Sequence, residues 1–542
     1  MTFLKTCFVI GIFFVQSQLL VALDIPHNEL MDNCTAILVT KTASTDGSVM
    51  ATHAVDGNFE FRIHLVPGGT HLQGAMRPIL RGGGSGRERD PAYIVGEIPE
   101  ISQTYTRYDA SYSFMNEKQL LMGETTIGGK RDLYNDEGLF DIMELERIAL
   151  ERASTAREAI RIMGDLGTTY GYSDRGECLL IIDPGEAWMF EILGAGPLEP
   201  GAVWAARRIP EGHIGVSANR SRITTIDLED KDHYMASDNV FSLAEEMGWW
   251  DPASGETFVF NKVYSNPPGY YNTRREWRVF DILAPSMKLD PWNQDIPFSV
   301  KPDKKVSPRD LMQIHRDYYQ ETEFDQTKGL AAGPFGSPNR WSTRTRVPDG
   351  HIGWERSISV FRCAYCVVLQ ARDWLPDAIG GIAWFAEDDP KTSVFVPFYA
   401  GNSRVPRCFE VGGRDAFERS SAWWASNFVG NWAHLKFSYM IEDIKAEYTR
   451  LEDQFFFMQP IIDKTVQSLF ATDPEAARDF ITQYSVSQAQ SAVNAWWKLA
   501  DNLVAKYCDG YINLPTTGQS VGYPEDWLEA VGYGKVKIKI SR

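Results

Sequence analysis

The sequence predicts a mixed α/β or α+β protein whose β-sheets are covered by helices. Short segments of alternating apolar and polar residues with turn signals between them occur in the first 200 residues and again around residues 357–397. Helical spacing occupies residues 142–164, and a longer and mostly helical stretch fills residues 420–507. Segments of both kinds within one chain, with no internal repeat and no low-complexity segment, favour a layered structure of sheets and helices.

The predicted strands begin near the N-terminus. Residues 34–70 alternate apolar and polar, and the turn at Asp46-Gly47 predicts a hairpin between its two flanking strands. Cys178–Asp183 and Ala187–Leu193 form another predicted pair, joined by a turn at Pro184-Gly185. Three further strand candidates follow: Ser357–Leu369, Gly381–Phe385 and Ser393–Pro397.

The helical segments are distinguished by their 3–4 residue spacing. Ile142–Gly164 has several Glu and Arg residues four positions apart, and Ser154 is the expected cap. Ser420–Tyr507 is predicted to be mostly helical, with breaks at Pro460 and at Asp473-Pro474. The aromatic runs of this segment are interpreted as core rather than as ligand sites: Trp423-Trp424 and Phe455-Phe456-Phe457.

Composition excludes several classes of protein. The 542 residues include 44 Gly and 28 Pro, an ordinary share that excludes a collagen-like or a low-complexity disordered chain. The formal net charge is −18, from 54 Lys and Arg against 72 Asp and Glu. Phosphate neutralisation needs clustered basic residues, so no nucleic-acid partner is expected.

The first residues resemble a secretory leader. Lys5 precedes an almost wholly apolar run from Cys7 to Ala22, and polar and acidic residues follow from Asp24. This run has the length of a signal-peptide core and is short for a bilayer span of roughly 20 residues. We therefore expect a cleavable signal at residues 1–22 and no membrane association afterwards, with an uncleaved signal anchor as the alternative.

The seven cysteines do not form a disulfide scaffold. Cys7 would leave with the signal, and six cysteines are too few to staple a chain of this size. Cys363 and Cys366 form a CxxC motif, but no second pair lies at zinc-finger spacing, so two buried thiols are expected. If one cysteine is a nucleophile, the remaining five cannot all pair with one another.

Cys34 is the candidate nucleophile. If residues 23–33 were removed after the signal, Cys34 would begin the mature chain, with Asn33 and Cys34 flanking the processing site. Its thiol would then be the nucleophile and its own α-amine, whose ordinary pKa is about 7.7–8.0, the proton acceptor. Taken by itself, a single Cys that opens a strand is more often a buried apolar residue than a nucleophile.

Blocks of sequence in a fixed order resemble peptidase family C69, the dipeptidases with an N-terminal nucleophile cysteine. The resemblance spans about residue 33 to the end of the chain. It implies an Ntn-hydrolase αββα four-layer sandwich and cleavage of dipeptides through a thioester on Cys34, without a metal or other cofactor. The blocks are Asp32–Val39, Lys41–Met50, Gly123–Gly129, Tyr170–Tyr172 with Asp183–Trp188, Ala218–Ile223, Arg275–Val279, Gly333–Trp341 and Arg372–Pro376.

The domain organisation expected from this resemblance has four parts. Residues 1–22 are the signal, 23–33 the propeptide and 34–410 the catalytic core, and residues 411–542 form a mainly helical region packed on that core. The α+β class predicted from the residues alone and the sandwich implied by the family agree.

The resemblance also implies supporting residues on the strand after Cys34. In the related bile-salt hydrolase and penicillin acylase branch, an Arg and an Asp lie three residues apart on that strand. Here His53 and Asp56 occupy those positions. Asp56 is the candidate for holding an amine through charge-assisted hydrogen bonds, with the first residue of a turn as its other interpretation. His53 departs from the Arg and is otherwise a histidine on a strand face.

Later blocks supply the remaining candidates. Asn219 resembles the family's asparagine that lines the nucleophile or oxyanion pocket, although Asn219-Arg220-Ser221 also fits a glycosylation site. Arg275 is placed on a strand that carries a site arginine in the family. Glu124 and Thr125 are candidates for an oxyanion donor or an amine anchor, or else mark a strand end before a glycine turn.

Three functions are considered for this sequence, and the first of them is the leading interpretation. The first is a dipeptidase that acts on short peptides in the secretory pathway, either secreted or in a lysosome or vacuole. The second is an amidase on N-acyl amino acids or bile-salt-like conjugates, and the third is a non-catalytic secernin-like protein. A homo-oligomer is compatible with each of them.

Overall fold

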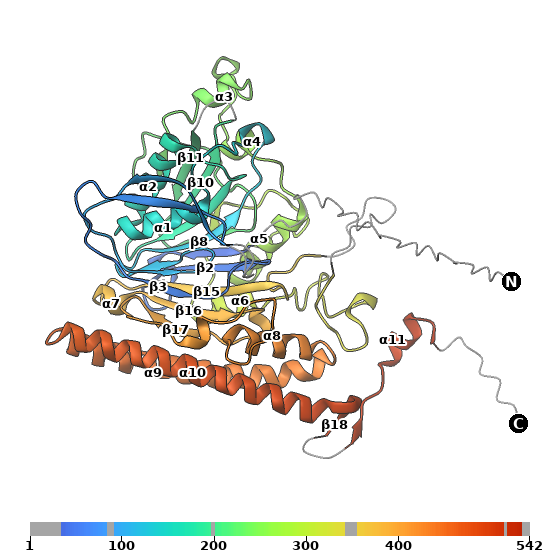
Figure 1. Cartoon of the computed structure of the whole chain (residues 1–542). Coiled ribbons are helices and arrows are strands. Elements are labelled where there is room, and N and C mark those ends of the chain that lie inside the picture. The colour runs from blue at the N-terminus through green and yellow to red at the C-terminus, as the bar shows by residue number, and fades with distance from the viewer. Residues whose placement is uncertain (1–33, 84–90, 197–200, 342–354, 514–517, 534–542) are drawn as a thin grey trace, which may run out of the picture. The chain divides into compact units, whose positions relative to one another are not determined.

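Two antiparallel sheets form the centre of the protein (Figure 1). The computed structural model describes residues 34–83, 91–196, 201–341, 355–513 and 518–533. The predicted signal, the predicted propeptide and Asn33 lie outside these residues. Within the described part, the chain is a mixed α and β protein with a helical C-terminal region, as the sequence predicts.

The first sheet has seven strands in the order β14-β12-β1-β2-β15-β16-β17. The predicted hairpin is its centre, with Leu38 of β1 opposite Ala51 of β2. The predicted CxxC strand is β15, which starts at Cys363 rather than at Ser357. The bounds are β1 Ala36–Val39, β2 Val49–Asp56, β12 Ile214–Ser217, β14 Ser299–Val300, β15 Cys363–Ala371, β16 Ile382–Glu387 and β17 Val396–Tyr399.

The second sheet has eight strands in the order β13-β11-β10-β9-β8-β7-β6-β3. Its β9–β10 pair confirms the second predicted hairpin, with Ile182 opposite Ala187. The bounds are β3 His64–Val66, β6 Arg107–Asp109, β7 Met115–Asn116, β8 Leu121–Thr126, β9 Glu177–Ile182, β10 Ala187–Gly194, β11 Ala202–Arg208 and β13 Tyr234–Ala236. Two smaller sheets pair β4 Met76–Arg81 with β5 Tyr93–Pro99, and β18 Tyr511–Ile512 with β19 Gln519–Ser520.

The two large sheets lie face to face, with β2 against β8 and β9. The approach is closest at Gly123 on β8, where an added Cβ would lie 2.5 Å from the Thr52 carbonyl oxygen and 3.2 Å from the His53 Cβ. Only glycine fits this contact without moving the backbone of β2. The close approach places the next residue of β8, Glu124, beside His53.

Two helices cover the outer face of the eight-stranded sheet: α1 Ile142–Arg152 and α2 Ala156–Tyr170. The sequence predicts one helix here, whereas the chain breaks between them. Asp141 caps α1, and Thr155 caps α2 by accepting a hydrogen bond from the Glu158 N–H. The predicted cap at Ser154 is therefore wrong by one residue, because Thr155 has the extended backbone that a cap requires.

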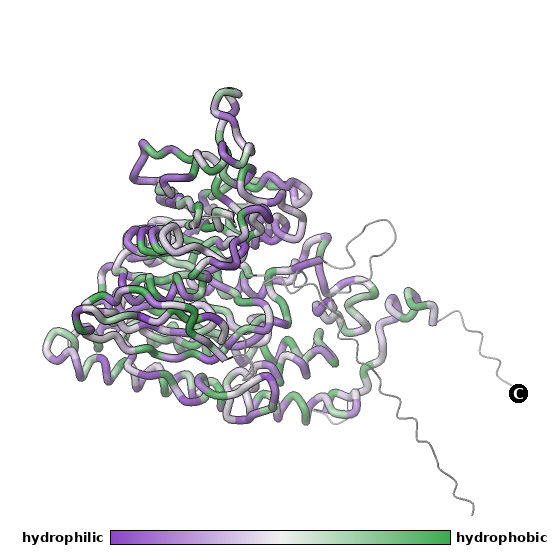
Figure 2. The backbone as a smooth tube through the Cα atoms, turned by 45° about the horizontal axis from the view of Figure 1, so that its top comes forward, coloured by the Kyte–Doolittle hydropathy of each residue, from purple (hydrophilic) through white to green (hydrophobic). Residues whose placement is uncertain are grey.

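The C-terminal helices cover the seven-stranded sheet. The helices α9 Phe437–Phe470 and α10 Pro474–Tyr507 run side by side and α10 packs on β17, while the shorter α8 Ala422–Ala433 packs on β16. In Figure 2, hydrophobic and hydrophilic residues alternate along these helices. The predicted break at Asp473-Pro474 is confirmed, with Asp473 capping α10.

The predicted break at Pro460 is wrong, because α9 continues through it. Pro460 has no N–H for the carbonyl four residues earlier, so the helix loses one hydrogen bond there. Packing of α9 on α10 and β17 maintains the helix on both sides. The aromatic runs are largely core: Trp423 and Phe455 are buried, whereas Phe457 is 71% exposed.

The remaining helices connect the sheets or extend from them. Their bounds are α3 Ser242–Glu246, α4 Phe260–Tyr264, α5 Tyr270–Leu283, α6 Pro308–His315, α7 Asp377–Gly380 and α11 Glu525–Ala530. Among the described residues, no helix is both long and apolar enough to span a bilayer.

Candidate active site

Cys34 lies between the two large sheets, just ahead of β1. Its side chain is fully buried, and its Sγ donates a hydrogen bond to Glu124 Oε2 at 3.4 Å. Its carbonyl oxygen accepts a hydrogen bond of 2.7 Å from Arg275 Nη1. Both the thiol and the backbone of Cys34 are therefore held by residues that are distant in the sequence.

His53 and Glu124 complete a compact cluster with Cys34. His53 is on β2, and its Nε2 lies 3.3 Å from Oε2 of Glu124 on β8. One ligand atom from each of the three residues lies within 4.8 Å of the others. The His53 ring packs edge-on against Tyr112 and Tyr365, at centroid distances of 5.3 and 6.3 Å. The structure thus brings together three of the predicted site residues, Cys34, His53 and Glu124, which we call the thiol cluster.

The Glu124 carboxylate is the electrostatic centre of the thiol cluster. Burial by itself raises its pKa, but contacts with Glu177, His53 and Cys34 outweigh burial and lower the pKa below the ordinary value. Glu124 is therefore an anion at neutral pH, with one oxygen directed at the thiol hydrogen of Cys34. An ionised carboxylate in this position can take up or hold a proton beside the sulfur.

Arg275 is buried and connects Cys34 to Asn219. It lies on helix α5 rather than on the predicted strand, because buried residues recur there at helical spacing, as at Thr273, Glu276 and Phe280. Its guanidinium donates to the Cys34 carbonyl, to Thr35 Oγ1 at 3.0 Å and to Asn219 Oδ1 at 2.9 Å. Burial lowers its pKa to about 10, so it stays charged at neutral pH.

Asn219 is held from both ends of its amide. Its Oδ1 accepts from Arg275, and its Nδ2 donates to the Thr126 carbonyl at 3.1 Å. Its backbone is left-handed, with φ 62°, which asparagine tolerates better than most residues. A glycan on Nδ2 would displace the bond to Thr126, and the residue is 5% exposed. The folded arrangement therefore favours a structural or site role over a glycosylated one.

Asp56 is outside the thiol cluster. It ends β2 and is fully buried in an ion pair with Arg356. Burial raises the pKa of Asp56, against the opposing charges of Arg356, Arg362 and Arg275. Arg356 is 300 residues away in the sequence, and no local pattern marks it as the partner of Asp56.

Thr125 is also separate from the thiol cluster. Its hydroxyl makes a 2.6 Å hydrogen bond with Ser217 of β12, so it links the two sheets. A direct role as an amine anchor is not supported by this contact.

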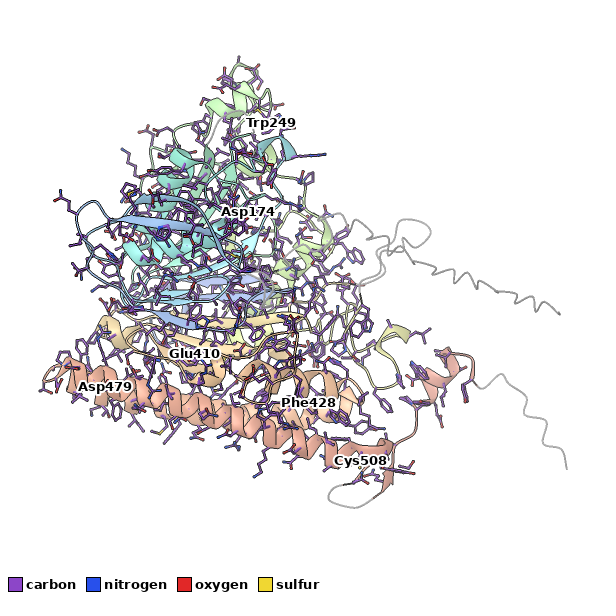
Figure 3. All side chains as sticks on the ribbon, in the orientation of Figure 1. Asp174, Trp249, Glu410, Phe428, Asp479 and Cys508 are labelled. Atoms are coloured by element: carbon purple, nitrogen blue, oxygen red, sulfur yellow. The ribbon has the colours of Figure 1, made fainter. Side chains whose placement is uncertain are left out.

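Further acidic residues, which the sequence does not predict as part of a site, surround Glu124. Glu146 on α1 is fully buried, and burial together with the charge of Glu124 raises its pKa well above the ordinary value. Glu177 on β9 contacts Glu124 directly. Asp174, labelled in Figure 3, is half-buried in the same region, and its pKa is raised by desolvation and by the charge of Glu124. Glu146 and Glu177 lie within largely apolar elements, and this position becomes a signal only once the elements are placed.

None of the six cysteines that the structure describes forms a disulfide, and every one except Cys508 is buried. This confirms the two buried thiols predicted at Cys363 and Cys366. Among the described residues, the cluster of Cys34, His53 and Glu124 is the one group of metal-ligating side chains at ligand spacing.

Comparison with known protein families shows which family the chain belongs to. The model of peptidase family C69 matches residues 96–450. The chain belongs to peptidase family C69. The matched region includes Glu124, Asn219 and Arg275.

The chain is also similar to proteins named as dipeptidases, along most of their length. A probable dipeptidase of Salmonella dublin is 28% identical over 68% of this chain and 81% of its own. A probable dipeptidase of Latilactobacillus sakei is 27% identical over 68% and 74%. A probable dipeptidase B of Lactococcus lactis is 25% identical over 88% of this chain and 96% of its own.

Proposed function

We propose that this protein is a cysteine dipeptidase of the N-terminal nucleophile type, with an Ntn-hydrolase fold. The observation that carries the proposal is the hydrogen bond from the thiol of Cys34, just ahead of β1, to the ionised and buried Glu124 of β8. Family membership and relatives named as dipeptidases support dipeptides as substrates. The two facing sheets with helices on their outer faces support the fold.

Activation begins at the bond between Asn33 and Cys34. Glu124 accepts the thiol proton, and Sγ attacks the Asn33 carbonyl carbon. The C–N bond breaks, the proton goes to the Cys34 nitrogen, and a thioester joins residue 33 to Sγ. Water then hydrolyses the thioester, which releases the prosegment and leaves Cys34 with a free α-amine and a free thiol.

Peptide hydrolysis then follows the same pattern in two steps. The thiolate attacks the scissile carbonyl of a dipeptide, and the α-amine or Glu124 carries the thiol proton to the leaving amine. Water hydrolyses the resulting thioester. Arg275 fixes the Cys34 carbonyl and thereby the direction of the thiol, and Asn219 is held ready beside it.

The substrate termini account for the other charged residues in this proposal. A dipeptide has an ammonium group and a carboxylate a few ångströms apart. The anionic Glu124 on β8 and Asp56 at the end of β2 suit the ammonium group. The buried arginines near Asp56 suit the carboxylate. The leader at residues 1–22 directs this activity to the secretory pathway, outside the cell or in a lysosome or vacuole.

The test compares wild type with Cys34→Ser and with Cys508→Ser, which replaces the one exposed thiol among the described cysteines. N-terminal sequencing of wild type and of Cys508→Ser is expected to start at Cys34, and both are expected to hydrolyse a panel of dipeptides. Cys34→Ser is expected to keep residue 33 and to lose at least about 1,000-fold in kcat/KM. A wild-type protein that starts at Cys34 and cleaves neither dipeptides nor N-acyl amino acids would refute the proposal.

A further inference from the structure

We propose that the thiol cluster is also a zinc-binding site, at which Zn²⁺ reversibly inhibits the enzyme. The cluster supplies one sulfur, one imidazole nitrogen and one carboxylate oxygen, from Cys34, His53 and Glu124. These are the three ligand types that zinc binds most often in proteins. The inference rests on the proposed function for the state of Cys34, but its direct readout is metal binding.

The distances fit a tetrahedral ion. With Zn–S near 2.3 Å and Zn–N or Zn–O at about 2.0–2.2 Å, neighbouring ligand atoms in a tetrahedron lie about 3.3–3.6 Å apart. Glu124 Oε2 is 3.4 Å from Cys34 Sγ and 3.3 Å from His53 Nε2. Two edges of the tetrahedron are therefore already formed by the side chains, without a change of backbone.

His53 is oriented towards such an ion. Its Nε2 is buried and, despite the short distance to Glu124, makes no hydrogen bond among the described residues. A buried ring nitrogen in this situation is costly unless a partner completes it. A cation between His53, Glu124 and Cys34 satisfies the nitrogen lone pair and neutralises the carboxylate in one step.

Removal of residues up to Asn33 would supply the fourth ligand. The free α-amine and Sγ of an N-terminal cysteine close a five-membered chelate ring on one metal ion, so the mature chain has an N, S, N, O ligand set. Arg275 holds the backbone at the ring and donates to Thr35 and to the Cys34 carbonyl. Glu124 is fixed by a 3.3 Å hydrogen bond from Thr126 Oγ1, in the manner of outer-shell partners of metal ligands.

The ion would block catalysis by occupying the groups that catalysis uses. Zinc on Sγ binds the electron pair that must attack the substrate carbonyl, and zinc on the α-amine removes the proton acceptor. Inhibition is therefore expected to be competitive with dipeptides and to be reversed by a chelator. Because binding requires a deprotonated thiol, it releases a proton and strengthens as the pH rises.

The experiment uses Cys508→Ser as background, because Cys508 is an exposed thiol that would bind metal by itself. Figure 3 places Cys508 at the end of the long helices, away from the large sheets. A protease-cleavable sequence directly before Cys34 gives every variant the same N-terminus, which intact mass confirms. Binding of Cd²⁺ is followed by its ultraviolet thiolate charge-transfer band, and Zn²⁺ is titrated in competition and in the dipeptide assay.

One bound ion per chain and loss of activity over the same range of free Zn²⁺ are expected. His53→Gln and Glu124→Gln are expected to weaken Cd²⁺ binding by about 100-fold or more. The matched control is His233→Gln, which removes an exposed histidine that lies 2.9 Å from Asp230 and outside the thiol cluster. Cd²⁺ binding is expected to be unchanged in this variant. Uncleaved protein is expected to bind more weakly, because its Cys34 nitrogen is an amide.

Three results would overturn the inference. An active, metal-free enzyme that shows no charge-transfer band, or equal binding in His53→Gln and wild type, would exclude the site while leaving the dipeptidase proposal intact. Activity that disappears on chelation and returns with Zn²⁺ would show that the ion assists rather than inhibits. A protein that binds Cd²⁺ as expected but hydrolyses no dipeptide would refute the proposed function and not the site.

Discussion

Two regions of the molecule differ in how far apart in the sequence their contacting residues are. One is the interface between the two large sheets, and the other is the pair of helices α9 and α10. In α9 the buried residues repeat every three or four positions, and the turn to α10 takes only residues 471–473. At the sheet interface, Cys34 bonds to Glu124 across 90 residues and to Arg275 across 241 residues. The helix pair is thus specified by local pattern, and the candidate site by topology.

The largest expected effect in this comparison is on the chemistry of the interface. Glu124→Gln keeps the shape of the side chain but removes the anion beside Sγ, so kcat/KM for dipeptides is expected to fall by about 10²–10⁴-fold. The matched control is Glu146→Gln, because Glu146 is a second buried carboxyl near Glu124, and burial raises its pKa whereas the pKa of Glu124 is lowered. Steady-state kinetics on the two folded variants makes the measurement.

The pH profile provides a second readout of the same contrast. The pKa of Glu124 is lowered in the folded protein, so its contribution to stability is present above the ordinary pKa of about 4.3 and is lost as the pH falls through the lowered value. The acidic limb of activity due to Glu124 is therefore expected below the ordinary range. Equal activity losses in Glu124→Gln and Glu146→Gln would contradict the assignment.

The next effect contrasts a buried long-range ion pair with an exposed local one. Arg356→Met leaves the Asp56 carboxyl buried without its main counter-charge and is expected to cost about 3–5 kcal/mol of unfolding free energy. Arg450→Met removes the pair with Glu447 on α9, at an exposed site three residues away, and is expected to cost less than about 0.5 kcal/mol. Urea unfolding followed by fluorescence compares them. Similar urea-unfolding midpoints for both variants would show that burial of the Asp56 carboxyl does not need the charge of Arg356.

A smaller loss is expected from steric crowding between the sheets. Gly123→Ala places a Cβ 2.5 Å from the Thr52 carbonyl, which is backbone and cannot rotate away, at an expected cost of about 1–3 kcal/mol. Because His53 follows Thr52 on β2, kcat is expected to fall as well. Gly522→Ala is the control, since nothing lies within 4 Å of its added Cβ. A stable and fully active Gly123→Ala protein would mean that the sheets separate at little cost.

This difference in range explains what the sequence predicts and what it leaves open. The β1–β2 and β9–β10 hairpins, the strands around Cys363 and the helices after Ser420 follow local periodicity and turn residues, and they are found near the expected positions. The break predicted at Pro460 is wrong, because the packing that maintains α9 is tertiary.

The same distinction applies to the candidate site: single residues can be identified from the sequence, but their contacts depend on the fold. Resemblance singles out Cys34, His53 and Glu124 one by one, but their meeting depends on how β1, β2 and β8 face one another. Arg356 and Glu146 carry no local signal, because a buried titratable side chain is recognisable only after the residues around it have been placed. Long-range electrostatics is therefore the part of this site that one sequence cannot specify.

The smallest expected effect tests the locally specified region. Asp473 caps α10 by accepting a 3.0 Å hydrogen bond from the Ala476 N–H, with Pro474 as the first helical residue. Asp473→Ala leaves that donor unpaired and is expected to cost about 1 kcal/mol by urea unfolding. Dipeptide kcat/KM is expected to stay at the wild-type value, because α10 packs on β17, at the edge of the seven-stranded sheet and outside the thiol cluster. Asp473→Asn, which keeps an oxygen acceptor, is expected to restore most of the lost stability. A drop in kcat/KM in Asp473→Ala that Asp473→Asn reverses would show instead that the helix pair positions the site, and that the two regions are energetically one.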